Sequence, residues 1–372
     1  MAANSAVQSE RIGPGFETAT AATLAAPPTL PVAHACFHIP SLDGIRAVAF
    51  ALVFIAHVWI SSLGAFGVSL FFFLSGFLIT TLLRRENDRY GTISLRTFYL
   101  RRALRIFPPL YLTILFILFL VVIGIAEGRL EAGPIAAATA YGANYWEIFK
   151  GFHIAGFTPF WSLAVEEHFY LFFPLLFLFM NKSGMSYKKQ ALLLGGICAA
   201  VLAWRFGLVL ELKETNPLRI MYGTDTRMDT ILFGCILALV ANPVMDHKIR
   251  PSLLFFLLGL GLLLLSVMYR GPLFRLTARY TLQGIAFMPI FRFAILKSGS
   301  YFRCLNWRWV AFIGTLSYTL YLIHLTLLEA ALARFRSRNI AALIAIAASV
   351  LYAYAMYRVV EVPAAQIRRR TA

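Results

Sequence analysis

Apolar runs of about 18 to 22 residues recur along this chain, and they constrain its fold more than any other feature. Only helices and closed β-barrels satisfy all of their backbone polar groups within hydrocarbon, and these runs are too long for barrel strands. The sequence is 60% hydrophobic and only 14% charged, whereas soluble domains carry roughly 25% charged residues. We therefore predict an all-α, polytopic integral membrane protein.

The runs predict about ten transmembrane helices with both termini in the cytoplasm. The expected spans are residues 42–62, 66–84, 105–124, 161–180, 190–209, 228–243, 252–269, 278–296, 309–332 and 339–360. The loop over residues 84–105 holds seven Arg and no Lys, which is the strongest cytoplasmic signal in the chain. Residues 135–149 are an eleventh candidate, and counting Lys and Arg does not decide the matter. Because that run is short and contains Asn144 and Glu147, we expect an interfacial helix there.

The chain divides into three parts. Residues 1–40 are rich in Ala, Thr and Pro, and we expect a disordered or loosely attached cytoplasmic tail. Residues 41–363 form the transmembrane domain, and residues 364–372 form a basic cytoplasmic tail.

The charge balance points to the membrane. There are 34 Lys and Arg against 17 Asp and Glu, a formal net charge of +17. In a soluble protein that excess would suggest nucleic acid, but here the positive charges lie between apolar runs, where they orient spans and meet lipid headgroups or anionic substrates. We expect the lipid bilayer as a partner and no nucleic acid. The four cysteines are scattered without a CxxC pair or a neighbouring His, which predicts neither a metal site nor a disulfide framework.

The first span carries two ionisable side chains, Arg46 and His57. Eleven helical residues turn through about 1,100°, some 20° from three full turns, so both side chains share a face roughly 16 Å apart along the axis. An unpaired ionisable group in lipid costs several kcal/mol, so such residues mark candidate functional sites. The alternative is an interfacial Arg and a His that is hydrogen-bonded inside the bundle.

Two further groups of ionisable residues flank the spans. Arg102 and Arg105, one turn apart at the cytoplasmic mouth of the third span, are suited to grip phosphate, although positive-inside anchoring explains them equally well. Glu166 and Glu167 enter the fourth span from the outer side, where the helix dipole favours carboxylates. We expect an outer polar cluster of His57, Glu166, Glu167, Asp225, Arg227 and Asp229, facing a cytoplasmic cationic cluster of Arg46, Arg102 and Arg105. For Asp225, Arg227 and Asp229, a helix cap and an ion pair remain an alternative explanation.

Two motifs within spans are more typical of packing. Ser75 and Gly76, in the second span, allow close approach of helices. The ninth span carries Tyr318, Tyr321 and His324 at intervals of three residues. Each side chain is rotated by about 60° around the helix from the one before, and such a loose stripe is more often structural than catalytic.

Four motifs occur in one specific order: LDGIRAVAFALVFIAH, FFFLSGFLI, FYLRRALRIFPPLY and WSLAVEEHFYL. In these, and in SYTLYLIH and the closing VEVP, the chain resembles the membrane-bound acyltransferase family 3 from about residue 41 to Pro363. His168 stands where that family usually has Gln. The chain ends at Ala372, which resembles the stand-alone form without a hydrolase-like extracytoplasmic domain.

The resemblance implies an O-acyltransferase of the bacterial cytoplasmic (inner) membrane. Its usual reaction moves acetyl from cytoplasmic acetyl-CoA to a hydroxyl of an extracytoplasmic or cell-envelope glycan, such as a lipid-linked sugar, with no metal. The family's catalytic His falls on His57, and its donor-associated arginines fall on Arg46, Arg102 and Arg105. We expect Glu167, or else Glu166, to orient His57. Our further candidates are Ser75 on the donor side, and Trp161, Tyr170, Asp225, Arg227 and Asp229 on the acceptor side.

Two alternative functions stay open. An acyltransferase for a small antibiotic, such as a macrolide, shares the chemistry and differs in its acceptor. A transporter or flippase would use the same buried polar residues along a substrate pathway. The absence of an inverted repeat and the presence of the phosphate-suited Arg pair favour the enzyme.

Overall fold

The predicted spans all coincide with helices. The computed structural model describes residues 40–151, 156–211, 213, 216–246, 250–297, 299–300 and 302–370, and the regular structure in these ranges is entirely helical. The ten helices that match predicted spans are α1 (Pro40–Val58), α2 (Ser62–Tyr90), α3 (Leu95–Val122), α6 (Phe160–Lys182), α7 (Tyr187–Leu210), α9 (Thr224–Val240), α10 (Leu253–Met268), α12 (Arg279–Leu296), α13 (Arg308–Arg334) and α14 (Arg338–Met356). The all-α fold is therefore confirmed. The tail expected over residues 1–40 lies, apart from residue 40, outside the described residues.

Seven of the described helices are long and apolar enough to cross a membrane. They are α1, α2, α3, α6, α7, α13 and the apolar stretch that begins with α14. The remaining three, α9, α10 and α12, are shorter or more polar, and α9 is buried along most of its length. Length and apolarity thus support a multi-pass membrane protein, while the count of ten and the side of the termini stay predictions.

Residues 135–149, the candidate for an eleventh span, lie in two short helices, α4 (Ala132–Thr139) and α5 (Ala143–Phe149). At 1.5 Å per residue each is about 10 to 12 Å long, well short of the ~30 Å hydrocarbon core. Asn144 at the start of α5 is buried and donates hydrogen bonds to the Tyr222 carbonyl and to Thr224 Oγ1. The polar residue that argued against a span therefore ties α5 to α8 (Pro217–Tyr222) and α9.

Small residues set two of the closest helix contacts. A Cβ added at Gly76 of α2 would collide with the Ile231 carbonyl of α9, and one added at Gly314 of α13 would collide with the Asp43 carbonyl of α1. Glycine is therefore needed at both positions for backbones to approach this closely. These contacts hold α2 close to α9, and α13 close to α1.

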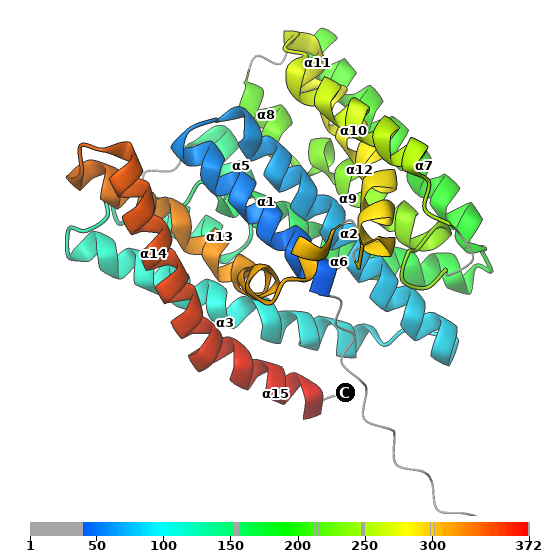
Figure 1. Ribbon diagram of the computed structural model, residues 1–372, viewed down its shortest axis with the longest axis horizontal. Coiled ribbons are helices and arrows are strands. Elements are labelled where there is room, and N and C mark those ends of the chain that lie inside the picture. Colours follow the sequence, from blue (N-terminus) through cyan, green and yellow to red (C-terminus); the bar gives the residue numbers. More distant parts are fainter. Residues whose placement is uncertain are drawn as a thin grey trace, which may run out of the picture. The chain divides into compact units, whose positions relative to one another are not determined.

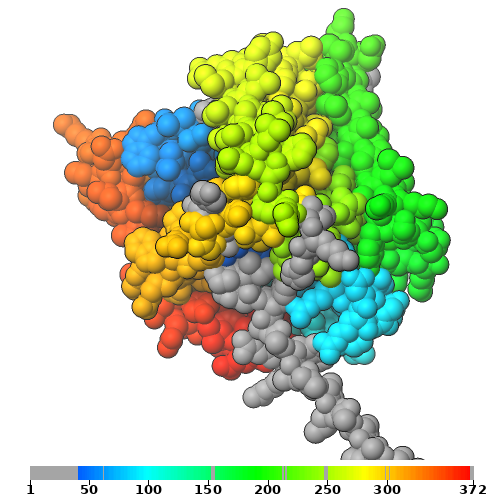
Figure 2. Space-filling view, turned by 45° about the vertical axis from the view of Figure 1, so that its right-hand side comes forward, coloured from blue at the N-terminus to red at the C-terminus, as the bar shows by residue number. Residues whose placement is uncertain are grey.

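The remaining helices enclose this group from different sides. Figure 1 shows α3 running across one side of the bundle, where it packs against α13 and against α15 (Val362–Arg370) at the carboxyl end. A five-residue π-helical segment, η2 (Tyr357–Glu361), joins α14 to α15. Figure 2 shows α7 (green) beside the yellow segment of α10, α12 and the short α11 (Pro272–Leu276), in the upper part of one face. The interior between α1, α2, α3, α6 and α13 contains most of the predicted site residues.

Candidate active site

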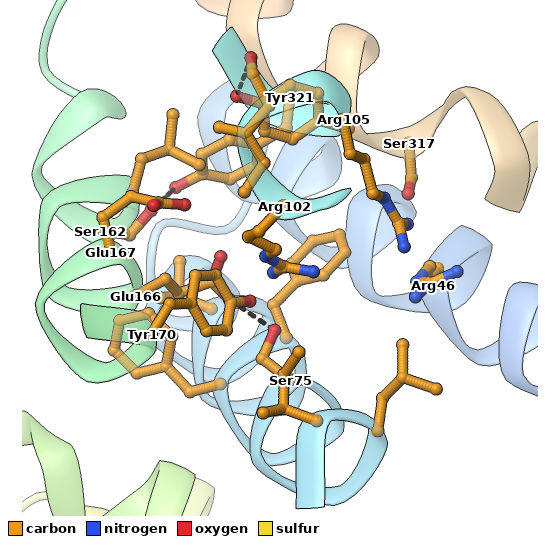
Figure 3. A pocket seen from close by; sticks show the side chains of 18 of the residues that line it. Arg46, Ser75, Arg102, Arg105, Ser162, Glu166, Glu167, Tyr170, Ser317 and Tyr321 are labelled. Carbon is orange, nitrogen blue, oxygen red and sulfur yellow. Dashed lines mark hydrogen bonds between the residues drawn. The ribbon is translucent and has the colours of Figure 1, made fainter. Parts of the chain in front are cut away.

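A cavity lies among α1, α2, α3, α6 and α13 (Figure 3). The cavity is partly open to solvent, and the centre of a water molecule can occupy about 90 Å³ of it. Its polar and aromatic-hydroxyl lining consists of Arg46, Ser75, Arg102, Arg105, Ser162, Glu166, Glu167, Tyr170, Thr315, Ser317, Tyr318 and Tyr321. Arg105 is exposed, whereas Tyr170 and Tyr321 are buried, so the cavity runs from an accessible cationic end into the bundle.

Three arginines converge on the accessible end. Arg46 comes from α1, and Arg102 and Arg105 come from adjacent turns of α3 (Figure 3). Arg46 Nη1 lies 2.6 Å from Asp43 Oδ1, and the Arg102 guanidinium carbon lies 3.6 Å from the centre of the Tyr170 ring. Guanidinium groups present several N–H donors in a planar fork that matches phosphate oxygens. This end of the cavity is therefore chemically suited to a phosphorylated ligand.

Two carboxylates share the cavity with these arginines. Glu166 Oε1 accepts a hydrogen bond of 2.7 Å from Ser75 Oγ, and Glu167 lines the wall beside it. We expected both carboxylates in an outer cluster apart from the arginines, and that expectation is wrong. One reason is the start of α3, which begins at Leu95 rather than at residue 105. Arg102 therefore lies on the second turn of a helix and not in a loop before it, and it lines the same cavity as Glu167.

His57 lies beyond the cavity rather than in its wall. Its Nδ1 is 3.3 Å from Nε2 of His324, which is completely buried on α13. The partner of His57 is thus a second histidine, not the carboxylate of Glu167 or Glu166 that we expected to orient it. The Tyr321 ring lies 5.6 Å from the His324 ring, centre to centre, and Tyr321 also lines the cavity. His324 therefore lies next to the part of the cavity that Tyr321 lines.

Asp225 and Asp229 are both held in ion pairs outside the cavity. Asp225 accepts hydrogen bonds of 2.9 and 2.6 Å from Arg219 and one of 2.7 Å from Trp204. Asp229 is completely buried and accepts bonds of 3.2 and 2.6 Å from Arg205, which is also completely buried. The ion-pair alternative accounts for both aspartates, so the outer polar cluster does not exist as one group.

Arg227 and Trp161 lie among aromatic rings near that network. The Arg227 guanidinium carbon is 3.7 Å from the centre of the Tyr280 ring, and its Nη2 donates to Ser69 Oγ at 3.2 Å. Trp161 stacks on Tyr222 with ring centres 4.3 Å apart. Burial raises the pKa of Tyr222 to about 12, and Glu147 adds to this shift, so its phenol is neutral at physiological pH. Neither Arg227 nor Trp161 lines the cavity, and their acceptor-side role stays a prediction.

Several residues with polar side chains had no site role predicted from the sequence, and some of them line or adjoin the cavity. Tyr321 shares a hydrogen bond of 2.7 Å with Ser162, and the Tyr318 hydroxyl donates to the Ile106 carbonyl at 3.2 Å. The signal for them was the polar motif SYTLYLIH inside an apolar span, which we interpreted as structural. Arg205 was missed although an Arg within a predicted span is itself a signal. His168, whose role the sequence left open, lies outside the cavity and shares a bond of 2.8 Å with Thr224.

Across the described residues, no three His, Cys, Asp or Glu side chains are grouped so that they could hold a metal ion.

Comparisons with known proteins place these residues in a wider context. A family model described as an acyltransferase domain matches residues 39–358. O-acetyltransferase OatA of Staphylococcus aureus is 32% identical over 77% of this chain and 50% of its own length. A second Staphylococcus aureus protein, provisionally named an O-acetyltransferase, is 30% identical over 88% of this chain and 57% of its own length. The chain therefore spans about half the length of these relatives. No solved structure matches it.

Proposed function

Because the chain belongs to the acyltransferase domain family, we propose that it is an integral-membrane O-acyltransferase of the bacterial cytoplasmic membrane. It takes an acyl group, acetyl by default, from acyl-CoA and transfers it to a hydroxyl of an extracytoplasmic or cell-envelope glycan. The observation that carries the proposal is the cavity, which has three arginines at its accessible end and adjoins a histidine pair at its buried end.

The donor binds with its nucleotide at the arginines. Arg46, Arg102 and Arg105 give the phosphates of CoA charge-assisted hydrogen bonds. The pantetheine arm then extends along the cavity toward Tyr321, which carries the thioester away from the charged end. The roughly 16 Å along the helix between Arg46 and His57 is comparable to the length of that arm.

The chemistry takes place beside His57. Its ring takes the proton of the acceptor hydroxyl as the oxygen attacks the thioester carbonyl carbon. The C–S bond then breaks, and the departing CoA sulfur takes the proton from His57, which gives an ester and free CoA.

Release of free CoA is the test of the proposal. Purified protein in detergent is incubated with acetyl-CoA labelled in the acetyl group, with and without bacterial envelope glycan, and free thiol and acylated product are measured. We expect CoA release that depends on the acceptor, with label in the glycan. A transporter or flippase would release no CoA, and that result would reject the proposal. Label on a macrolide, but not on glycan, would reject the glycan as acceptor and retain the transfer.

A further inference from the structure

Two histidines from distant parts of the sequence contact each other, one of them (His57) exposed and the other (His324) buried. His57 of α1 and His324 of α13 are 267 residues apart, yet Nδ1 of the first lies 3.3 Å from Nε2 of the second. Their ring centres are 5.1 Å apart. Contact at this distance between ring nitrogens requires one of the two to carry the hydrogen. The surroundings of His324 decide which one.

One ring nitrogen of His324, Nδ1, must be a hydrogen-bond donor. Its Nδ1 lies 2.9 Å from the carbonyl oxygen of Tyr321, one turn earlier on α13. A carbonyl oxygen can only accept, so Nδ1 carries a hydrogen. The ring is completely buried, and it contacts Phe50 edge-on with ring centres 5.6 Å apart. An uncompensated charge is costly in such a place. A neutral His324 therefore has its lone pair on Nε2, facing His57.

The consequence for His57 is a fixed tautomer. Its Nδ1 must carry the hydrogen that His324 Nε2 accepts, and its Nε2 is then left with the lone pair.

We propose that His324 is a positioning residue, which holds His57 in the tautomer whose Nε2 takes the proton of the acceptor hydroxyl. The proposal rests on the proposed function, in which His57 is the general base. In other hydrolases and transferases a carboxylate orients the catalytic histidine. Here a neutral imidazole provides the acceptor, and it adds no negative charge to the apolar interior. The chain of hydrogen bonds runs from His57 through His324 to the Tyr321 carbonyl.

The tautomer itself is measurable. Nitrogen-15 NMR of protein labelled in its histidines distinguishes a ring that is protonated on Nδ1 from one that is protonated on Nε2, and the His57 signals are identified by their loss in His57→Gln. We expect wild-type His57 to carry its hydrogen on Nδ1. A wild-type ring protonated on Nε2 would overturn the inference, even if no His324 variant folds.

Kinetics of variants supply the second readout. His324→Phe keeps a flat ring but removes the acceptor, so kcat should fall more than about tenfold while acetyl-CoA affinity stays at the wild-type value, since the arginines are untouched. In His324→Gln an amide oxygen can replace Nε2 as acceptor and should restore part of kcat. Phe50→Leu controls for packing, because Phe50 contacts the His324 ring without a hydrogen bond. It should keep kcat near the wild-type value.

The outcomes separate the two proposals. An active His57→Gln variant would reject the general base and therefore the proposed mechanism. An inactive His57→Gln variant together with full turnover and an unchanged tautomer in His324→Phe would reject only the role of His324. Equal losses in His324→Phe and Phe50→Leu would also reject it, because packing alone would then explain the effect.

Discussion

If the cavity binds the donor as we propose, single residues decide its affinity. Arg102 and Arg105 line the cavity, while their neighbour Arg101 on α3 does not. Each charge-assisted hydrogen bond to phosphate is worth roughly 1.5 to 3 kcal/mol. Replacing either lining arginine by Ala should therefore weaken acetyl-CoA binding by about tenfold or more, and Lys should rescue only partly because it lacks the fork geometry.

Isothermal titration with acetyl-CoA measures this effect, and Arg101→Ala is the matched control. We expect the control to keep the wild-type affinity. If all three Ala variants inserted normally and bound acetyl-CoA equally well, the lining arginines would be topology anchors and not donor ligands.

The two aspartates of α9 should differ sharply in their effect on stability. Asp229→Ala leaves the completely buried Arg205 charge without its carboxylate, which costs about 3 to 5 kcal/mol. Asp225→Ala removes a partner of Arg219 at a partly exposed site, which costs about 1 kcal/mol or less. Thermal unfolding in detergent compares the two variants. Similar midpoints would contradict the structural role that we assign to Asp229.

The sequence was sufficient to identify cavity residues but not to pair them. Arg46 stood out because ionisable groups are costly in lipid, Arg102 because its spacing from Arg105 suits phosphate, and Glu166 because it enters an apolar span. All three line the cavity. Their shared cavity could not be predicted, since it depends on where α3 begins and on how the helices pack. The contact of His57 with His324 was equally out of reach. No short sequence motif indicates which side chains contact each other between two spans when the residues are 267 positions apart.

At the scale of helices, backbone contacts between glycines and neighbouring carbonyls set the packing. A methyl group at Gly76 would meet the Ile231 carbonyl, which cannot rotate away as a side chain could. Gly76→Ala should therefore destabilise the protein by about 1 to 3 kcal/mol. Gly195→Ala on α7 is the control, because nothing lies within 4 Å of the added methyl group.

Thermal unfolding of both variants in detergent checks this. We expect a lower midpoint for Gly76→Ala, and an unchanged or slightly higher one for Gly195→Ala because Ala favours the helix. Equal midpoints would show that α2 and α9 are not held at the distance described here.

Helix existence was predictable and helix ends were not. Each predicted span became a helix because long apolar runs have no other way to satisfy their backbone in lipid. The start of α3 at Leu95 was missed, because the arginine-rich segment before residue 105 was interpreted as a loop. Its start instead depends on Ser94, whose side chain caps the helix by accepting a hydrogen bond from the Thr97 backbone N–H.

At the scale of the whole molecule, the proposal requires the arginines to face the cytoplasm. The loop at Ser94 should then lie inside, and Gly128, beyond the far end of α3, should lie outside. In a background without the four native cysteines, Ser94→Cys should react with an impermeant thiol reagent only after the membrane is opened. Gly128→Cys should react in intact cells. The reverse pattern would put the cationic end of the cavity on the outer side and reject cytoplasmic acyl-CoA as donor.

The central claim is that His57 is the general base of acyl transfer, and His57→Gln tests it most directly. An amide keeps a hydrogen bond but cannot take a proton, so the variant should fold, insert and bind acetyl-CoA as the wild type does. Its rate of transfer from acetyl-CoA to glycan should be lower by about 10² to 10⁴-fold, the usual worth of one positioned base. A well-folded His57→Gln protein that transfers acetyl at the wild-type rate would contradict the account.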